Sequence, residues 1–168
     1  MTYDVRRIFR ELADDERRHR IATAFWRHGD AQSKALAVAH LARALHFRDD
    51  SLRKLPLEKK ADLLASRAGS HEFDQLLEVA LVQYHTHEHN EMLSAFLDLW
   101  NIPHVNGSIE VDDYKVPAAG QVRDAVHQLE SRYDKRDIAI YLATAGLLMA
   151  GDWREAVWPV VDELKIKN

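Results

Sequence analysis

The spacing of apolar residues predicts helices along nearly the whole chain. Apolar residues recur every three or four positions, and Gly, Pro or Asp separates most of these segments, which is the pattern of helices that bury one face. The first segment is either one long helix or a pair kinked at the acidic residues 14–16, and a break near Thr86 divides the fourth. The alanine-rich segment 31–47 is expected at the centre of the bundle, because small side chains let neighbours approach closely. The predicted segments are 3–28, 31–47, 56–68, 71–100, 117–132, 135–150 and 153–165.

The pattern changes at residues 103–111, where two short alternating runs flank Asn106-Gly107. Asn-Gly accepts the positive φ angles of a type I′ turn, so a small β-hairpin is predicted here. The chain is therefore predicted to be all-α, built from antiparallel helical hairpins or a bundle of seven to eight helices, with this hairpin inserted. We expect one helical domain over 1–168. An alternative subdivision has a bundle at 1–101 and C-terminal helical hairpins at 117–165, joined by the hairpin and linker 102–116.

Composition and charge narrow the class of protein. Of the 168 residues, 46% are hydrophobic, which is enough for a substantial core. The net charge of −4 argues against a nucleic-acid partner, and the lack of cysteine excludes disulfides, thiolate metal ligands and cysteine nucleophiles. The N-terminus is charged, and the longest apolar run, 138–150, is too short to span a bilayer. We therefore expect a cytoplasmic protein with no membrane partner.

Candidate chemistry is concentrated in the histidines of residues 85–89. His85, Glu88 and His89 match the H-x-x-E-H signature of inverted zinc peptidases. On one helix, His85 and His89 lie one turn apart and can face one metal ion, while Glu88 activates bound water. The alternative interpretation is a helix junction, at which His85, His87 and His89 are partly exposed polar side chains whose charge responds to pH.

The same stretch resembles the end of DinB-like helical bundles, through His85-x-x-x-His89 followed by Leu93, Leu97 and Ile102-Pro103. In that family, two histidines on a late helix and one from the second helix surround a divalent metal. The resemblance therefore implies His40 or His46 as the third ligand. The chain departs from the family in having Asn90-Glu91-Met92 where Arg-Gly-Gln usually follows the pair, and in continuing well beyond the family's last helix.

The C-terminal helices offer a candidate interaction site. Residues 140–164 resemble a single tetratricopeptide unit, a helical repeat, with Gly151-Asp152-Trp153 at the turn. Trp153 and Trp158 are five residues apart, so they cannot both point the same way on one helix. One of them is therefore expected to be exposed as an anchor for a partner. The alternative is ordinary packing of both indoles at helix ends.

Together these observations favour a non-catalytic protein-interaction or assembly module over an enzyme. It would bind a protein partner or a second copy of itself, with Trp153 and Trp158 as contact residues, and would need no cofactor. The alternative is a metal-binding helical bundle, with or without metal-dependent enzyme activity. In that case His85 and His89, with His40 or His46, hold a divalent metal.

Overall fold

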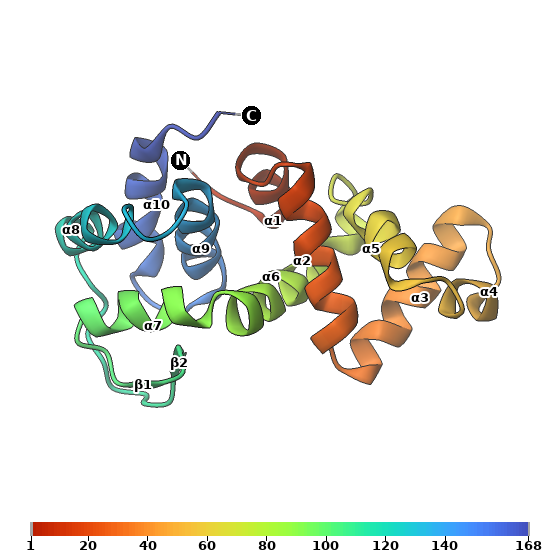
Figure 1. The fold of residues 1–168 in the computed structure, drawn as a ribbon, viewed down its shortest axis with the longest axis horizontal. Helices are drawn as coiled ribbons and strands as arrows, with labels where there is room; N and C mark the ends of the chain where they lie inside the picture. The colour runs from red at the N-terminus through yellow and green to blue at the C-terminus, as the bar shows by residue number, and fades with distance from the viewer. Residues whose placement is uncertain (1, 168) are drawn as a thin grey trace.

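The chain folds into helices and one β-hairpin, shown in Figure 1 for the computed structural model, which describes residues 2–167. The all-α prediction is confirmed, and so is the small hairpin. The described residues form ten α-helical segments instead of seven to eight, because α1 and α4 are short separate turns. The elements are α1 (Val5–Arg7), the π-helical η1 (Ile8–Leu12), α2 (Asp15–His28), α3 (Ala31–Leu45), α4 (Asp49–Arg53), α5 (Leu57–Ala65), the 3₁₀ turn η2 (His71–Phe73), α6 (Asp74–Glu88), α7 (Asn90–Leu99), β1 (His104–Val105), β2 (Ser108–Ile109), α8 (Ala119–Leu129), α9 (Lys135–Leu148) and α10 (Trp153–Leu164).

The helices form an elongated arrangement with α6 and α7 running end to end through its middle (Figure 1). Helices α3, α4 and α5 lie at one end, and α8, α9 and α10 lie at the other. The segment before α1 contacts α10, because the Tyr3 hydroxyl donates a 2.7 Å hydrogen bond to Asp162 Oδ1. No helix within residues 2–167 is long and apolar enough to cross a membrane.

The first segment is the kinked pair of the two predicted alternatives. Ala13 leaves the helical region, with φ −90° and ψ 123°, and this ends the π-helical turn. Asp14 then caps α2, because its side chain accepts a hydrogen bond from the backbone N–H of Arg17. The acidic run at residues 14–16 therefore starts a new helix at this point.

Helix α3 is not at the centre, contrary to the expectation from its alanine content. Its fully buried residues are confined to Ala37, Val38, Leu41 and Ala42, which make one narrow stripe. Figure 1 places α3 at the outer end of the molecule, beside α4 and α5. Small side chains permit close packing but add little apolar area to be buried, so they do not draw this helix into the core.

The β-hairpin forms where the sequence predicts it, as an antiparallel pair in which His104 faces Ile109. Asn106 and Gly107 both have positive φ, 50° and 84°, as a type I′ turn requires. The turn lies against α7: a Cβ added to Gly107 would be 2.9 Å from Leu93 Cβ. His104 Nε2 lies 3.0 Å from Asp98 Oδ1, which ties the hairpin to the end of α7.

Candidate functional site at the histidine junction

The break between α6 and α7 lies at His89, not near Thr86. His89 has φ −127° and ψ 26°, outside the helical region. Thr86 stays within α6, where its hydroxyl donates a 2.8 Å hydrogen bond to the carbonyl of Val82. A threonine satisfied in this way by the preceding turn does not cap the next helix.

His85 is the one histidine of this stretch that is fully buried, with 3% of its surface exposed. Thr144 Oγ1 donates its own proton to the carbonyl of Ile140 at 2.7 Å, so it can only accept from His85 Nε2, which lies 3.3 Å away. This assigns the proton to Nε2 and leaves Nδ1 as a buried acceptor with no hydrogen-bond partner. Burial lowers the pKa of His85 to about 3, with a smaller contribution from His89.

His89 lies beside His85 at the end of α6. The ring centroids of His85 and His89 are 6.4 Å apart, and the edge of the His89 ring packs against Tyr84 at 4.6 Å. Its Nε2 is buried and has no hydrogen-bond partner within residues 2–167. Burial lowers the pKa of His89, and the Asp137 carboxylate opposes that effect.

An ion pair between α2 and α9 is the third part of the buried polar cluster that includes His85 and His89. Arg17 Nε lies 2.6 Å from Asp137 Oδ1, and both side chains are largely buried. Asp14 and Asp134 also contact the Arg17 guanidinium, at 2.8 and 2.9 Å. The Tyr84 hydroxyl lies 3.5 Å from Asp137 Oδ1. These polar contacts join α2, α6 and α9 across an otherwise apolar core.

His87 points elsewhere, to the exposed end of α2. Its ring stacks on that of His28, with centroids 3.9 Å apart and planes 9° from parallel. Glu88, the general base of the peptidase motif, lies 3.7 Å from Arg20 instead of facing His85. Thus His85 and His89 lie in a buried group, while His87 belongs to a surface stack and Glu88 faces Arg20.

The other predicted metal ligands lie far from this junction. His40 packs on Phe73 before the start of α6, and its Nδ1 is 3.2 Å from Glu72 Oε1. His85 comes twelve positions after Phe73, and the helix therefore separates them by roughly 18 Å at 1.5 Å per residue. His46 is exposed and ends α3 with φ 55°. Within residues 2–167, no three His, Cys, Asp or Glu side chains are grouped so that they could hold a metal ion.

Both candidate interaction tryptophans are buried, so the expectation that one indole is exposed is wrong. Trp153 is 0% exposed and donates from Nε1 to the Tyr114 hydroxyl at 3.2 Å. Trp158 is 8% exposed and donates to the carbonyl of Ala143 at 3.3 Å. Trp153 packs on Trp100 and Tyr114, whereas Trp158 contacts Tyr3 and Ala143 of α9, so the two indoles are buried against different partners.

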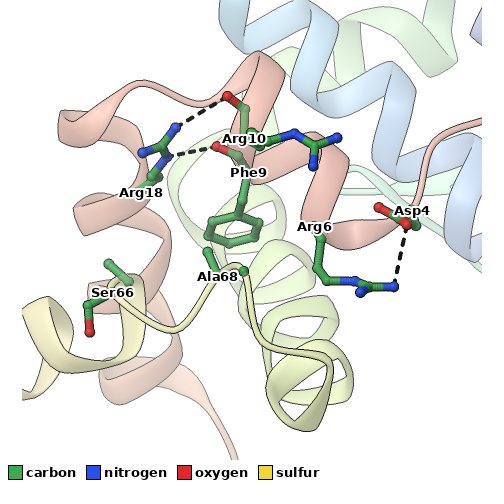
Figure 2. A pocket seen from close by; sticks show the side chains of 9 residues that line it. Asp4, Arg6, Phe9, Arg10, Arg18, Ser66 and Ala68 are labelled. Carbon is green, nitrogen blue, oxygen red and sulfur yellow. Dashed lines mark hydrogen bonds and ion pairs between the residues drawn. The ribbon is translucent and has the colours of Figure 1, made fainter.

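A cavity of about 430 Å³ beside η1 contains three arginines, but their charged groups do not converge (Figure 2). Arg18 donates to the carbonyls of Phe9 and Arg10 at 2.7 and 3.3 Å. Arg6 points to Asp4, 3.7 Å away, and Arg10 contacts Glu11 at 3.2 Å. These guanidinium groups therefore satisfy the end of the π-helical turn and nearby carboxylates, and they do not form a shared binding site.

Comparisons with protein-family models, with curated proteins and with solved structures each gave no match. Function must therefore be argued from the residues of this chain. The contacts that sequence analysis missed are those of Asp137 and Thr144 on α9. The available signal was the placement of one acidic and one hydroxyl residue within the apolar stretch 137–150.

Proposed function

We propose that the protein is a non-catalytic assembly module that binds a second copy of itself through the outer face of α3 and α6. The observation that carries this proposal is an open groove of about 350 Å³ between these helices. It is lined by apolar and polar residues, namely Leu36, Leu76 and Val79 with Asp30, Gln32, Ser33 and Gln75. Leu36 is 40% exposed, and Val82, which follows Val79 by one turn on the same side of α6, is 41% exposed. Apolar side chains exposed along a groove are typical of surfaces that bind a protein partner.

The distribution of charge favours a second copy as the occupant. Residues 27–69, which include α3, α4 and α5, contain nine Lys and Arg and five Asp and Glu, although the whole chain has a net charge of −4. The remainder of the chain therefore carries an excess of eight negative charges. The basic end of one copy attracts the acidic part of another. Such a head-to-tail contact joins different surfaces of the two copies, and it leads to rings or filaments.

Substitutions in the groove test this proposal. Leu36→Glu with Val82→Glu places two charges on the apolar contact, so we expect light scattering after size exclusion to show monomers of 19.4 kDa. The matched control is Val111→Glu with Leu148→Glu, because these residues are 37% and 38% exposed but lie away from α3. The control should associate like the wild type. Equal loss of association in both variants would contradict the assignment to this groove.

A metal-binding bundle is the second candidate, and one observation favours it. His85 Nδ1 and His89 Nε2 are both buried without a hydrogen-bond partner, and neutral imidazole nitrogens are good ligands for zinc and related metals. Metal analysis of tag-free protein, purified without chelator, tests this candidate. Near-stoichiometric metal that disappears in His85→Ala with His89→Ala would support it, and metal that persists in that variant would place the site elsewhere.

A further inference from the structure

A second open cavity, of about 330 Å³, lies between the end of α2 and helices α3, α4 and α5. Its lining includes three cations, from three different helices, and an apolar wall. The residues are Lys34, Arg53 and Lys60, with Trp26, Ala35 and Val38. None of the residues that line it is acidic.

The three cations differ from the arginines of the first cavity in having no ion-pair partner within residues 2–167. In the arginine-lined cavity of Figure 2, each guanidinium already contacts a carboxylate. Within residues 2–167, no carboxylate is in ion-pair contact with Lys34, Arg53 or Lys60. A concave surface lined by charge of one sign concentrates the field there and attracts ligands of the opposite sign.

Trp26, which lines the cavity, carries an unsatisfied hydrogen-bond donor. The residue is 7% exposed, and its indole N–H is buried with no acceptor within residues 2–167. The indole N–H groups of the other three tryptophans all have acceptors, namely the Gln121 carbonyl, the Tyr114 hydroxyl and the Ala143 carbonyl. The Lys60 ammonium lies 5.2 Å from the Trp26 ring centroid, so the indole also helps to position a cation.

We propose that this cavity binds a small phosphorylated molecule, with its phosphate group among Lys34, Arg53 and Lys60. Three positive charges suit a phosphate, which carries about two negative charges near neutral pH, better than a single carboxylate. Arginine in addition matches phosphate oxygens with two parallel hydrogen bonds. The volume is near the lower end of the roughly 300–1,000 Å³ typical of small-molecule sites.

This site is distinct from the proposed self-association surface. Lys34, Ala35 and Val38 lie on one side of α3, whereas Leu36 lies on the other, because successive helical residues are about 100° apart. The groove and the cavity therefore lie on different faces of α3, and each is tested with substitutions of its own lining residues.

The test is a titration with pyrophosphate, followed by the indole N–H signals of ¹⁵N-labelled protein at constant ionic strength. We expect the Trp26 signal, assigned with Trp26→Phe, to shift and saturate below about 10 mM, the weak end of specific binding. The indole signals of Trp100, Trp153 and Trp158 should stay in place, since those groups already have partners.

Paired variants distinguish a site from general attraction to basic residues. Lys34→Gln with Lys60→Gln should weaken pyrophosphate binding about tenfold or more, because two charge-assisted contacts are removed. Lys54→Gln with Lys59→Gln removes equal charge from exposed residues that do not line the cavity, and its affinity should stay within about twofold of the wild type. Melting curves without pyrophosphate confirm that each variant is folded.

Three results would overturn the proposal. The first is a Trp26 signal that does not saturate with pyrophosphate in a folded wild-type protein. The second is a control pair that loses as much affinity as the cavity pair, which would indicate diffuse electrostatic attraction. The third is acetate that binds as tightly as pyrophosphate at matched ionic strength, which would exclude a preference for phosphate.

Discussion

His85 is a buried histidine kept neutral by its surroundings. Its ring is enclosed by α6 and α9, with Thr144 as its hydrogen-bond partner and Tyr141 at a ring-centroid distance of 5.6 Å. A charged imidazolium in this position would lose its hydration, which is why burial lowers the pKa to about 3. The stability of the α6–α9 contact should therefore depend on pH.

We expect the free energy of unfolding to fall as pH decreases below about 6.5. The unfolded chain binds a proton at His85 below its ordinary pKa of 6.5, whereas the folded chain does not do so until about pH 3. The contribution of this histidine is therefore complete above pH 6.5 and is lost on acidification, by roughly 1.4 kcal/mol per pH unit. Urea denaturation at several pH values, for the wild type and for His85→Gln, measures this effect.

The difference between wild type and His85→Gln should change by about 2 kcal/mol between pH 7 and pH 5. Leu81→Ala is the control, because it removes a fully buried side chain from the same helix without removing a titrating group. Its destabilisation of about 2–5 kcal/mol should not vary with pH. A pH-independent difference for His85→Gln would show that His85 is not held neutral.

The Arg17–Asp137 ion pair is a second buried polar interaction in the core. Asp137→Asn removes a carboxylate that is largely buried against Arg17, and we expect a loss of about 2–4 kcal/mol in unfolding free energy. Glu163→Gln removes the carboxylate of the exposed Arg123–Glu163 pair and should cause little change. Similar effects from both substitutions in denaturant melts would contradict a special role for the buried pair.

At the scale of elements, α9 and α10 pack tightly at Gly146. A Cβ added to Gly146 would collide with the Trp158 indole and lie 2.8 Å from Val157 Cγ2. Trp158 is buried and hydrogen-bonded to Ala143, so it cannot move away easily. The lack of a side chain at Gly146 therefore sets how closely the two helices approach.

Alanine substitutions at two glycines should have opposite effects on stability. Gly146→Ala is expected to lower the free energy of unfolding by about 1–3 kcal/mol through overpacking. A Cβ added to Gly120 in α8 has no neighbour within 4 Å. Gly120→Ala should therefore raise the free energy of unfolding by about 0.5 kcal/mol through higher helix propensity. Thermal or urea denaturation measures both, and a stabilised Gly146→Ala would contradict the described packing.

The elements that could be predicted are those specified by nearby residues. Asn106-Gly107 determines its hairpin because both residues adopt positive φ readily, and Asp14 starts α2 through a hydrogen bond within its own first turn. The break at His89 could not be placed, because a long-range contact to Thr144 on α9 fixes the last turn of α6. Threonine at position 86 is compatible both with the cap of a new helix and with the interior of a continuing one.

At the scale of the whole molecule, the candidate sites depend on contacts between distant residues. Arg17 and Asp137 are 120 positions apart, and no local pattern pairs them. Trp153 is buried against Trp100 and Tyr114, and Trp158 against Tyr3 and Ala143, all distant in the chain, which helical spacing does not specify. The exposed groove beside α3 likewise exists because that helix is peripheral. The cytoplasmic location and the division into domains stay predictions.

The uneven distribution of charge gives the proposed association a salt dependence. The excess of four positive charges in residues 27–69 faces an excess of eight negative charges elsewhere in the chain. Attraction between exposed charges is screened over about 10 Å at 0.1 M salt and over about 3 Å at 1 M. Head-to-tail contacts between copies should therefore weaken as salt is added.

Sedimentation velocity of the wild-type protein tests the central claim most directly. The measurement covers a range of protein concentrations at low and high sodium chloride. We expect species larger than the 19.4 kDa monomer that increase with concentration at low salt and decrease at high salt. A single monomeric species at every concentration in low salt would contradict the assembly module.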